Sequence, residues 1–269
     1  MLKNTDETPI NYTACCTLAD LTHQPTIEAE KIKNAKRGDL DLKYTVKSIQ
    51  NYECKEWLLK KHYAKRIPSI TYAFGLYDGI NLVGVCTYGQ PPCDQIQLCC
   101  GEKYKENTIE LNRLIKNDGL EKNVQSWFVA RTFEMLPKPL IILSYSDPNY
   151  GHNGYTYQAL NFLYTGKGGE TKEFIWKGKR YNSRHIKDYW FKANNLNFDT
   201  NKTIDENFTL AGGKVVKVEM KNRYVYFLGT KRQKQEMKKL LTYKVSEYPK
   251  GQNTNYDASY KPVFQTKLF

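Results

Sequence analysis

The feature that most constrains the fold is the stretch over residues 109–166, in which two apolar runs alternate with two helical patterns. Residues 109–115 and 139–145 are short and apolar, which is typical of buried strands. Residues 123–136 and 153–164 carry the start and stop signals of helices. Strand, helix, strand and helix in this order predict a right-handed crossover that brings the two strands together in parallel.

The chain before this stretch supplies further strands for the same sheet. Residues 40–49 alternate between apolar and polar side chains, which predicts a strand, and residues 48–64 follow as a helix. Residues 70–77 and 81–88 flank an Asp-Gly pair, which is a strong hairpin signal. Residues 93–108 show neither pattern and are expected to form a loop. We therefore predict the α/β (α+β) class, with a mixed sheet flanked by helices.

Composition divides the chain into three parts. Residues 1–40 are polar and predict a loosely ordered arm, whereas residues 41–169 hold the strand and helix patterns of the core. Residues 170–269 are basic and β-rich, and we expect them to complete the sheet and to bind a polyanion. Within this extension, residues 183–193 predict a basic aromatic helix and residues 214–228 predict a second hairpin.

Charge is distributed unevenly along the chain, whose formal net charge is +13. Residues 151–269 hold 22 Lys and Arg against 10 Asp and Glu, whereas residues 1–150 hold 19 against 18. A basic half with interleaved aromatic residues indicates double-stranded DNA or another nucleic acid as partner, and a solvated surface without a partner is the alternative. The cations that bracket the predicted aromatic helix are the candidates for DNA binding: Lys179, Arg180, Arg184 and Lys187.

Cysteine usage and hydropathy restrict the compartment. The seven cysteines lack CxxC spacing and are odd in number, which favours a reduced, cytosolic protein and matches no common zinc pattern. No run approaches the ~20 apolar residues of a membrane span. The first twelve residues lack an apolar core, so we expect no secretory signal.

Two polar residues stand where open parallel sheets bind ligands. Arg113 interrupts an apolar strand, so it requires either a phosphate or substrate anion, or an internal salt bridge with Glu110 or Asp147. Asp147 closes the second apolar run, a position that favours a general base or metal ligand. Its alternative role is that of a turn residue before Pro148.

The second predicted helix carries a candidate acid. Tyr157 lies one turn into this helix with Asn161 and Tyr164 on the same face, which suits either proton donation to a leaving group or an aromatic packing stripe. His152 lies between two glycines just before the helix, where a structural role and a proton-transfer role are both open.

Two further pairs mark helix ends. Asn123 and Ser126 begin the first predicted helix of the central stretch, where they suit capping and where free N–H groups attract a cofactor phosphate. His62 and Tyr63 end the earlier helix, where they suit iron binding or proton transfer, while a helix dipole alone also favours His62.

A nuclease is an alternative function. Glu219 and Lys221 form an ExK pattern on a predicted strand, with Asp205 upstream, as in many metal-dependent nucleases. An alternating strand that faces water explains the same pattern, and a non-catalytic DNA-binding protein remains a third alternative.

Taken together, the motifs HYAKRIPS, LVGVCTYGQP, ELNRL, NVQS, SYSDPNYGHNGYTYQALNFLYTG and RYVYFLG resemble the Mom family of bacteriophage DNA-modification proteins, over about residues 42–250. The resemblance implies a GNAT-like fold with the order strand, helices, three strands, helix, strand, helix and strand. It implies transfer of a small acyl-type (methylcarbamoyl) group to N6 of adenine in DNA, which protects phage DNA from restriction in the cytoplasm of the bacterial host. The oligomeric state, a dimer included, stays open.

The resemblance also implies roles for individual residues. Asp147 is the implied base, Tyr157 the acid to the leaving group, and Arg113 the cation that holds carboxylates or the cofactor. The resemblance further implies acetyl-CoA or a related acyl donor beside Asn123 and Ser126, and iron at His62 and Tyr63, with Tyr63 also catalytic. Ordinary GNAT proteins hold the CoA pyrophosphate with a glycine-rich turn, whereas this chain has DGLEKNVQS at that place.

Overall fold

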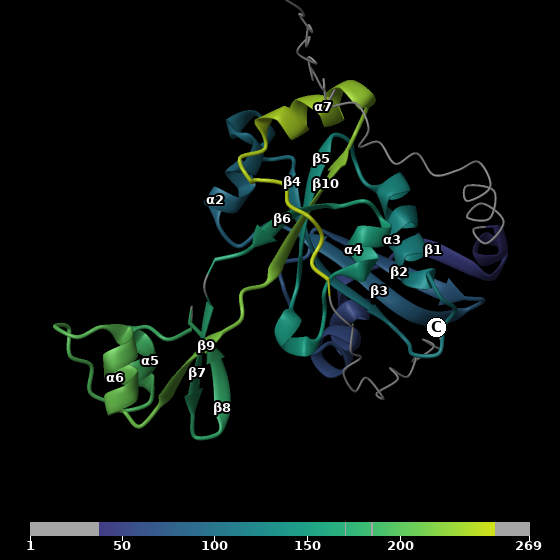
Figure 1. Ribbon diagram of the computed structural model, residues 1–269. Helices are drawn as coiled ribbons and strands as arrows, with labels where there is room; N and C mark the ends of the chain where they lie inside the picture. The colour runs from purple at the N-terminus through teal and green to yellow at the C-terminus, as the bar shows by residue number, and fades with distance from the viewer. Residues whose placement is uncertain (1–37, 170, 184, 251–269) are drawn as a thin grey trace, which may run out of the picture. The chain divides into compact units, whose positions relative to one another are not determined.

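A seven-stranded sheet forms the centre of the protein, with the strand order β1-β2-β3-β4-β5-β10-β6 (Figure 1). Neighbouring strands pair antiparallel except β4 and β5, which pair in parallel as predicted. The order of elements along the chain is the one that the GNAT resemblance implies, so the predicted GNAT-like mixed sheet is confirmed. The strands are β1 (Tyr44–Ser48), β2 (Tyr72–Asp78), β3 (Asn81–Gly89), β4 (Thr108–Lys116), β5 (Leu140–Ser146), β6 (Leu163–Lys167) and β10 (Asn222–Leu228).

The computed structural model describes residues 38–169, 171–183 and 185–250. The chain divides into two units, Met1–Leu42 and Lys43–Phe269, and all elements named here belong to the second. Most of the predicted polar arm therefore lies outside the described residues. Within the described part of the chain, no helix is long and apolar enough to cross a membrane.

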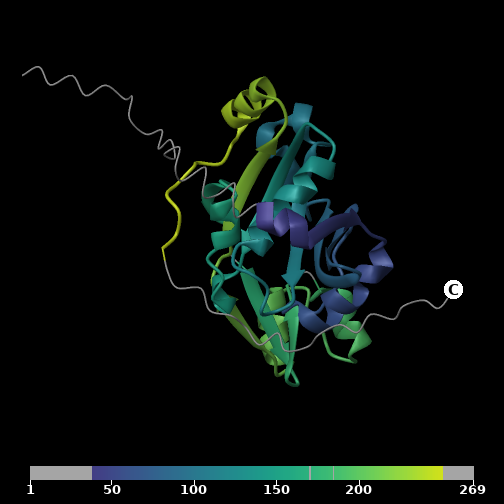
Figure 2. The same ribbon diagram turned by 90° about the vertical axis from the view of Figure 1, so that its right-hand side faces the viewer.

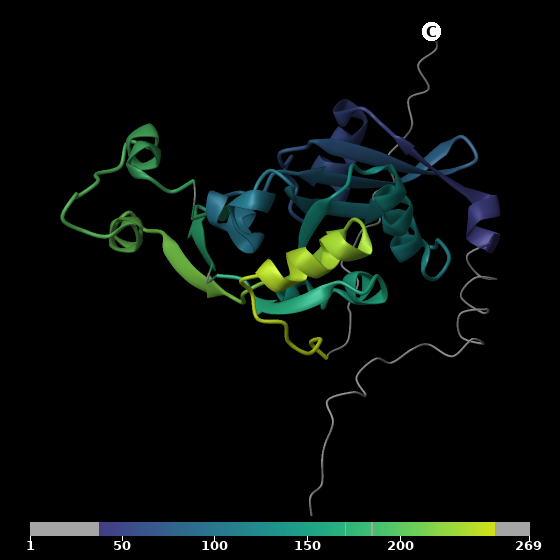
Figure 3. The ribbon, with the colours of Figure 1, turned by 90° about the horizontal axis from the view of Figure 1, so that it is seen from above.

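Short helices connect the strands. Residues 48–64, predicted as one helix, form η1 (Asn51–Cys54) and the π-helix η2 (Trp57–Lys61), and residues 93–108, predicted as a loop, contain three short helical turns. The turns are α2 (Asp94–Gln97), η3 (Leu98–Cys100) and η4 (Glu102–Tyr104). The segment predicted as a loop covers part of the sheet, because Cys99, Cys100 and Tyr104 pack against residues of β5 and β10. Its turn η3 also packs against α7 (Lys231–Leu240) (Figure 3).

The two helices of the central stretch differ from each other in length. The predicted helix over residues 123–136 is α3 (Val124–Met135), and it lies beside α4 (Tyr155–Ala159) (Figure 2). The prediction that the second helix continues to residue 164 is wrong. Asn161 takes a left-handed backbone conformation (φ 60°), which ends the helical run, and β6 begins two residues later.

A small lobe is inserted between β6 and β10. It holds a second sheet, ordered β8-β7-β9, and two helices, all around a core of its own (Figure 1). The predicted hairpin over residues 214–228 is wrong, because β9 pairs with β7 in the lobe while β10 returns to the central sheet. The elements of the lobe are β7 (Thr171–Trp176), β8 (Lys179–Asn182), α5 (Asp188–Ala193), α6 (Ile204–Leu210) and β9 (Lys214–Val218).

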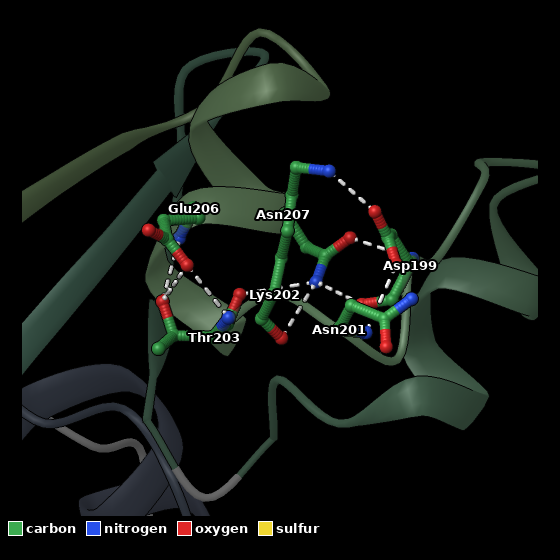
Figure 4. Close-up of polar contacts among 6 residues, drawn as sticks. All are labelled: Asp199, Asn201, Lys202, Thr203, Glu206 and Asn207. Carbon is green, nitrogen blue, oxygen red and sulfur yellow. Dashed lines mark hydrogen bonds and ion pairs between the residues drawn. The ribbon is translucent and has the colours of Figure 1, made fainter.

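A buried asparagine organises the loop between α5 and α6 (Figure 4). The Oδ1 atom of Asn207 accepts a hydrogen bond from the Asp199 amide (2.8 Å), and its Nδ2 donates to the carbonyls of Asp199, Lys202 and Thr203 (2.9, 3.2 and 3.0 Å). Thr203 and Glu206 form a capping box that starts α6. These bonds, together with Leu196 and Phe198, which pack against the core of the lobe, explain why a loop rich in Asn and Asp is ordered.

Candidate functional site

The site opens where β4 and β5 separate. The two strands pair only from Thr108 opposite Ile141 to Leu111 opposite Ser144, where the Ser144 hydroxyl donates to the Leu111 carbonyl (2.9 Å). Beyond this point β4 runs on to residue 116 without β5 beside it, and a cavity of about 200 Å³ opens. Six of the residues singled out from the sequence line this cavity: His62, Tyr63, Arg113, Asp147, His152 and Tyr157.

A β-bulge directs Arg113 into the cavity. Thr87 of β3 lies opposite Arg113 and Tyr88 lies opposite Leu111, so Asn112 is the additional residue on β4. The Asn112 side chain holds the bulge, because it accepts from the Thr87 hydroxyl (2.6 Å) and donates to the Ser69 carbonyl (2.8 Å). A bulge changes the direction of the side chains that follow it, and here the guanidinium faces the cavity.

Arg113 does not pair with Asp147. Of the two carboxylates that the sequence offered as partners, Asp147 pairs with Lys221 instead, while the charge of Glu110 favours the protonated guanidinium. Its Nη1 donates to the Asn112 carbonyl (2.5 Å), while its Nε is buried without a hydrogen-bond partner. Burial lowers the pKa of the guanidinium. A buried cation with an unused donor fits a ligand oxygen in the cavity.

Asp147 is fully engaged at the other wall. It begins the turn η5 (Pro148–Tyr150), where its Oδ1 accepts from the amide (3.1 Å) and the Nδ2 (2.8 Å) of Asn149. Its Oδ2 pairs with the Lys221 ammonium at 3.0 Å. The predicted turn role is therefore confirmed. The role of general base remains a prediction.

Aromatic rings form one side of the cavity. The ring of Tyr63 stacks on His62 (centroids 4.3 Å apart) and contacts Tyr150 on its other side (4.4 Å). Burial and then the nearby Arg113 lower the pKa of His62 to about 2, so its imidazole is neutral. Its Nδ1 accepts from the Ala64 amide (3.0 Å), which places the proton on Nε2. This wall is aromatic and offers an N–H donor.

His152 is the site residue that the sequence left most open. It lines the cavity 6.0 Å from the Tyr63 ring, and its amide donates to the Asp147 carbonyl (3.2 Å), which closes the loop after η5. Burial lowers the pKa of His152, while the Asp147 charge opposes this shift. The imidazole is therefore neutral at physiological pH and able to accept a proton.

The residues present do not fit an iron ion. Within residues 38–250, as far as the structure describes them, no group of three or more His, Cys, Asp or Glu side chains is placed to hold a metal. The Nδ1 lone pair of His62 is already used by a backbone amide. Nothing in the geometry thus supports the iron site expected at His62 and Tyr63.

Tyr157 combines the two roles that the sequence left open. Its ring packs against Phe162 (5.4 Å) and Tyr224 (5.3 Å), and the residue also lines the cavity. Burial raises its pKa, so the phenol stays protonated and can donate. The Tyr224 hydroxyl in turn donates to the Asn153 carbonyl (2.5 Å) and fixes the start of α4.

Gly154 provides a test of how α4 is placed. At φ +76°, a Cβ on this residue would lie 2.5 Å from the Tyr224 ring, whereas Gly119 has the same φ and open space around it. We expect Gly154→Ala to lower the free energy of unfolding by about 1–3 kcal/mol more than Gly119→Ala does, because only the former adds a clash to the strain. Urea unfolding of both variants measures the difference, and equal losses would contradict the packing described.

The start of α3 corrects a prediction. Asn123 does not cap the helix with its side chain; its backbone is left-handed (φ 72°), a conformation that asparagine tolerates. Ser126 donates its hydroxyl to the Asn123 carbonyl (3.0 Å) rather than to a ligand. Gln125 of the same turn lines the cavity. Because no side chain caps this turn, its N–H groups fit a phosphate of an acyl donor.

The residues of the nuclease alternative do not meet. Glu219 pairs with Lys167 (2.8 Å), Lys221 pairs with Asp147, and Asp205 pairs with Lys172 in the lobe. Each carboxylate is thus occupied by a different lysine, and the ExK pattern belongs to two separate ion pairs. The nuclease constellation that the sequence left open is not assembled.

The predicted DNA-binding residues lie on the inserted lobe. Lys179, Arg180 and Lys187 are exposed, and Arg180 pairs with Glu173 (3.0 Å), whereas Arg184 lies outside the described residues. Sequence reasoning passed over a denser basic surface, the exposed face of α7. Its cations form no ion pair within the part of the chain that is described: Lys231, Arg232, Lys234, Lys238 and Lys239.

Comparison with known proteins gives one family and a group of distant structures. A model of the Mom protein family matches residues 43–250. No curated protein matches the chain. A Bacillus subtilis acetyltransferase in complex with CoA is 13% identical, with 69% of this chain and 98% of that chain covered and a TM-score of 0.36.

Two further acetyltransferases are similar to the same degree. An N-acetyltransferase from Staphylococcus aureus Mu50 is 11% identical over 69% of this chain and 98% of that chain (TM-score 0.36). A putative acetyltransferase from Salmonella typhimurium with its cofactor acetyl-CoA is 9% identical over 52% and 93% (TM-score 0.35).

Proposed function

Because this chain belongs to the Mom protein family, we propose that it is an acyltransferase that attaches a small acyl-type (methylcarbamoyl) group to N6 of adenine in double-stranded DNA. The observation that carries the proposal is the cavity at the β4–β5 separation, which holds a guanidinium with an unused Nε–H donor, a neutral imidazole wall and a protonated phenol. In this role the protein acts in the cytoplasm of the bacterial host and protects phage DNA from restriction.

The cavity suits a base that has left the duplex. Chemistry on N6 requires the adenine to be flipped out of the stack, and flipped bases are held between aromatic faces. The adjoining rings of His62, Tyr63 and Tyr150 form an aromatic wall against which the base packs, and the Nε2–H of His62 provides a donor for a ring nitrogen. Apolar and neutral groups of this kind bind a base, whereas they do not bind free phosphate.

The acyl donor, acetyl-CoA or a relative, fits along the free side of β4. Residues 113–116 pair with β3 on one side but have no β5 partner on the other, so the N–H and C=O groups that face away from β3 are open to an extended ligand. The uncapped first turn of α3 follows, with N–H groups for a phosphate near Gln125 and Ser126. When bound, such a donor would supply the activated acyl carbon: an acetyl thioester would give an acetyl group, whereas a methylcarbamoyl adduct requires a related donor whose transferred group already carries the nitrogen.

The chain's own residues then divide the work. The Arg113 guanidinium stabilises the negative charge that develops on the acyl oxygen, which its unused Nε–H allows. Tyr157 donates a proton to the leaving group. Asp147 accepts the N6 proton, which becomes acidic once the nitrogen has attacked. His152 is the second candidate for this acceptor, because its imidazole is neutral and lines the same cavity.

The inserted lobe is the proposed grip on DNA. The lobe leaves the sheet at the end of β6 and returns at the start of β10, where Asn222 lies opposite Ser146. It therefore joins the sheet at the end where the cavity lies. The basic helix α7 follows the other end of β10, where Leu228 lies opposite Leu140 at the start of β5. A duplex with a base in the cavity would therefore lie closer to the lobe than to α7.

Salt dependence tests this grip. Neutralised phosphates release counterions, and each contact adds about 0.9 to the slope of log affinity against log salt. We expect the slope to fall by about two to three when the lobe cations Lys179, Arg180 and Lys187 are reversed to Glu, with weaker binding to all sequences alike. Reversal of three exposed lysines from the charge-balanced half should change it little: Lys47, Lys55 and Lys122. Equal losses from both sets would show that general basicity accounts for binding.

Mass spectrometry of DNA nucleosides tests the reaction itself. DNA from cells that express the protein should contain an N6-modified adenosine that is absent from cells with the empty vector. Intact DNA without an adduct would mean a non-catalytic DNA-binding protein, and fragmented DNA without an adduct would mean a nuclease. Either of these results overturns the proposed function.

A further inference from the structure

The inserted lobe is fastened to the turn that carries Asp147. In the central sheet, Asn222 pairs with Ser146 on one side and with Lys167 on the other. The end of the lobe at Asn222 therefore lies beside the residue that precedes Asp147, and the end at Lys167 lies one strand further away. The amide of Gly168 donates to the Lys221 carbonyl (2.7 Å) and joins the two ends of the lobe as a stem. The stem and the catalytic turn thus share one end of the sheet.

One side chain bridges the turn and the stem. The Nδ2 of Asn149 donates to the Glu219 carbonyl (2.9 Å), and its Oδ1 accepts from the Glu219 amide (3.2 Å), although the two residues are 70 positions apart. A side-chain amide that pairs with a backbone in both directions imitates a strand pair. The second hydrogen of Nδ2 goes to the Asp147 Oδ1 (2.8 Å), so every polar atom of the amide is used between stem and turn.

Two ion pairs support the bridge. Lys221 of the stem pairs with the Asp147 Oδ2 (3.0 Å), and Lys167 pairs with Glu219 (2.8 Å). The turn itself is a single turn of 3₁₀-helix in which Asn149 is exposed, and Tyr150 holds it on one side through its ring contact with Tyr63 (4.4 Å). The bonds of Asn149 and Lys221 therefore fix the position of Asp147. They also fix the position of His152, because the His152 amide donates to the Asp147 carbonyl.

We propose that Asn149 is a positioning residue that couples the inserted lobe to the catalytic turn, so that a lobe seated on DNA holds Asp147 and His152 in their working positions. For its effect on rate, the inference rests on the proposed function. Asn149 does not line the cavity, and it hydrogen-bonds Asp147 on the side of the turn, so it acts through Asp147 and the turn.

Hydrogen exchange tests the coupling without any reaction. We compare the full-length protein with Asn149→Ala and with the control Asn194→Ala, which removes one amide bond inside the lobe, to the Trp190 carbonyl (2.8 Å). In Asn149→Ala the amides of Tyr150, His152 and Glu219 should exchange at least about tenfold faster, as expected for local opening. A DNA duplex should slow exchange at Tyr150 and His152 in the wild type and in Asn194→Ala, but not in Asn149→Ala. Unchanged exchange at these amides, or DNA protection that survives in Asn149→Ala, overturns the inference.

The rate gives the second readout. Single-turnover modification by Asn149→Ala should fall on the order of 10²-fold while the Kd for DNA stays within about threefold, because a misplaced group loses catalysis without losing a contact to the substrate. If Asn149→Ala does not fold, Asn149→Asp replaces it: aspartate still accepts from the Glu219 amide but lacks both donors. A wild-type rate in a variant with fast exchange overturns the inference. A wild type that makes no adduct overturns the proposed function alone, because the exchange results stand without it.

Discussion

Replacing Asp147 with asparagine is expected to lower the rate of DNA modification by about 10²–10⁴-fold, while the affinity for DNA stays nearly unchanged. Asparagine keeps the size and the turn-forming tendency of aspartate, but it carries no charge and accepts a proton poorly. Single-turnover assays with nucleoside mass spectrometry measure the rate, and titration of labelled duplex measures affinity. An adduct level near that of the wild type would leave Asp147 with its turn role alone.

His152 provides the matched comparison for this result. If Asp147 accepts the proton, His152→Gln should retain most of the activity, because glutamine keeps a polar side chain beside the aromatic wall. If His152 is the acceptor, His152→Gln should lose as much as Asp147→Asn does. In that case, as the pH is lowered, the wild-type rate should begin to decline only at pH values below the usual titration range of histidine, because burial lowers the pKa of His152. The comparison of the two variants therefore shows whether Asp147 or His152 accepts the proton.

Local patterns were sufficient to predict most of the sheet. The apolar runs that became β4 and β5, and the Asp-Gly hairpin between β2 and β3, each follow from interactions within a few residues. Gly79 at that hairpin has φ +58°, as the turn signal requires. Periodicity identifies such elements because burial of alternating or continuous apolar faces is what stabilises them.

The site was predictable in its members but not in its contacts. The ion pair of Asp147 with Lys221 and the bridge of Asn149 to Glu219 join residues far apart in sequence, and no spacing rule reveals them. The direction of Arg113 was unpredictable for a related reason, because the bulge at Asn112 turns the guanidinium toward the cavity. A bulge adds one residue to a strand and leaves almost no mark in the sequence.

Helix ends were the least predictable local feature. Asn123 stands at the helix start that the sequence predicted, whereas Asn161 looked compatible with helix and ends it; each takes a left-handed backbone conformation. Asparagine favours both helix caps and left-handed turns, so its presence alone does not distinguish a helix start from a helix stop. The boundary at Asn161 places Tyr164 in β6. Of the three residues predicted to share one helix face, Tyr157, Asn161 and Tyr164, only Tyr157 therefore lines the cavity.

Tyr157→Phe is expected to reduce turnover by about 10²–10⁴-fold and to leave the melting temperature almost unchanged. Phenylalanine keeps the ring contacts with Phe162 and Tyr224 and removes only the hydroxyl, which is the proposed donor to the leaving group. Tyr164→Phe is the control, because the Tyr164 hydroxyl donates to Asn222 (3.2 Å) and Tyr164 does not line the cavity.

The leaving group itself makes the test of Tyr157 sharper than a loss of activity. A general acid matters less when the departing thiolate is more stable, so the defect of Tyr157→Phe should shrink with acyl donors built on thiols of lower pKa. The defect of Asp147→Asn should stay constant across the same donors, since the base acts on the nitrogen. A Tyr157→Phe variant with the wild-type rate would make this tyrosine a packing residue of α4. If the loss of rate in Tyr157→Phe is the same for all acyl donors, the hydroxyl acts in binding rather than in proton transfer.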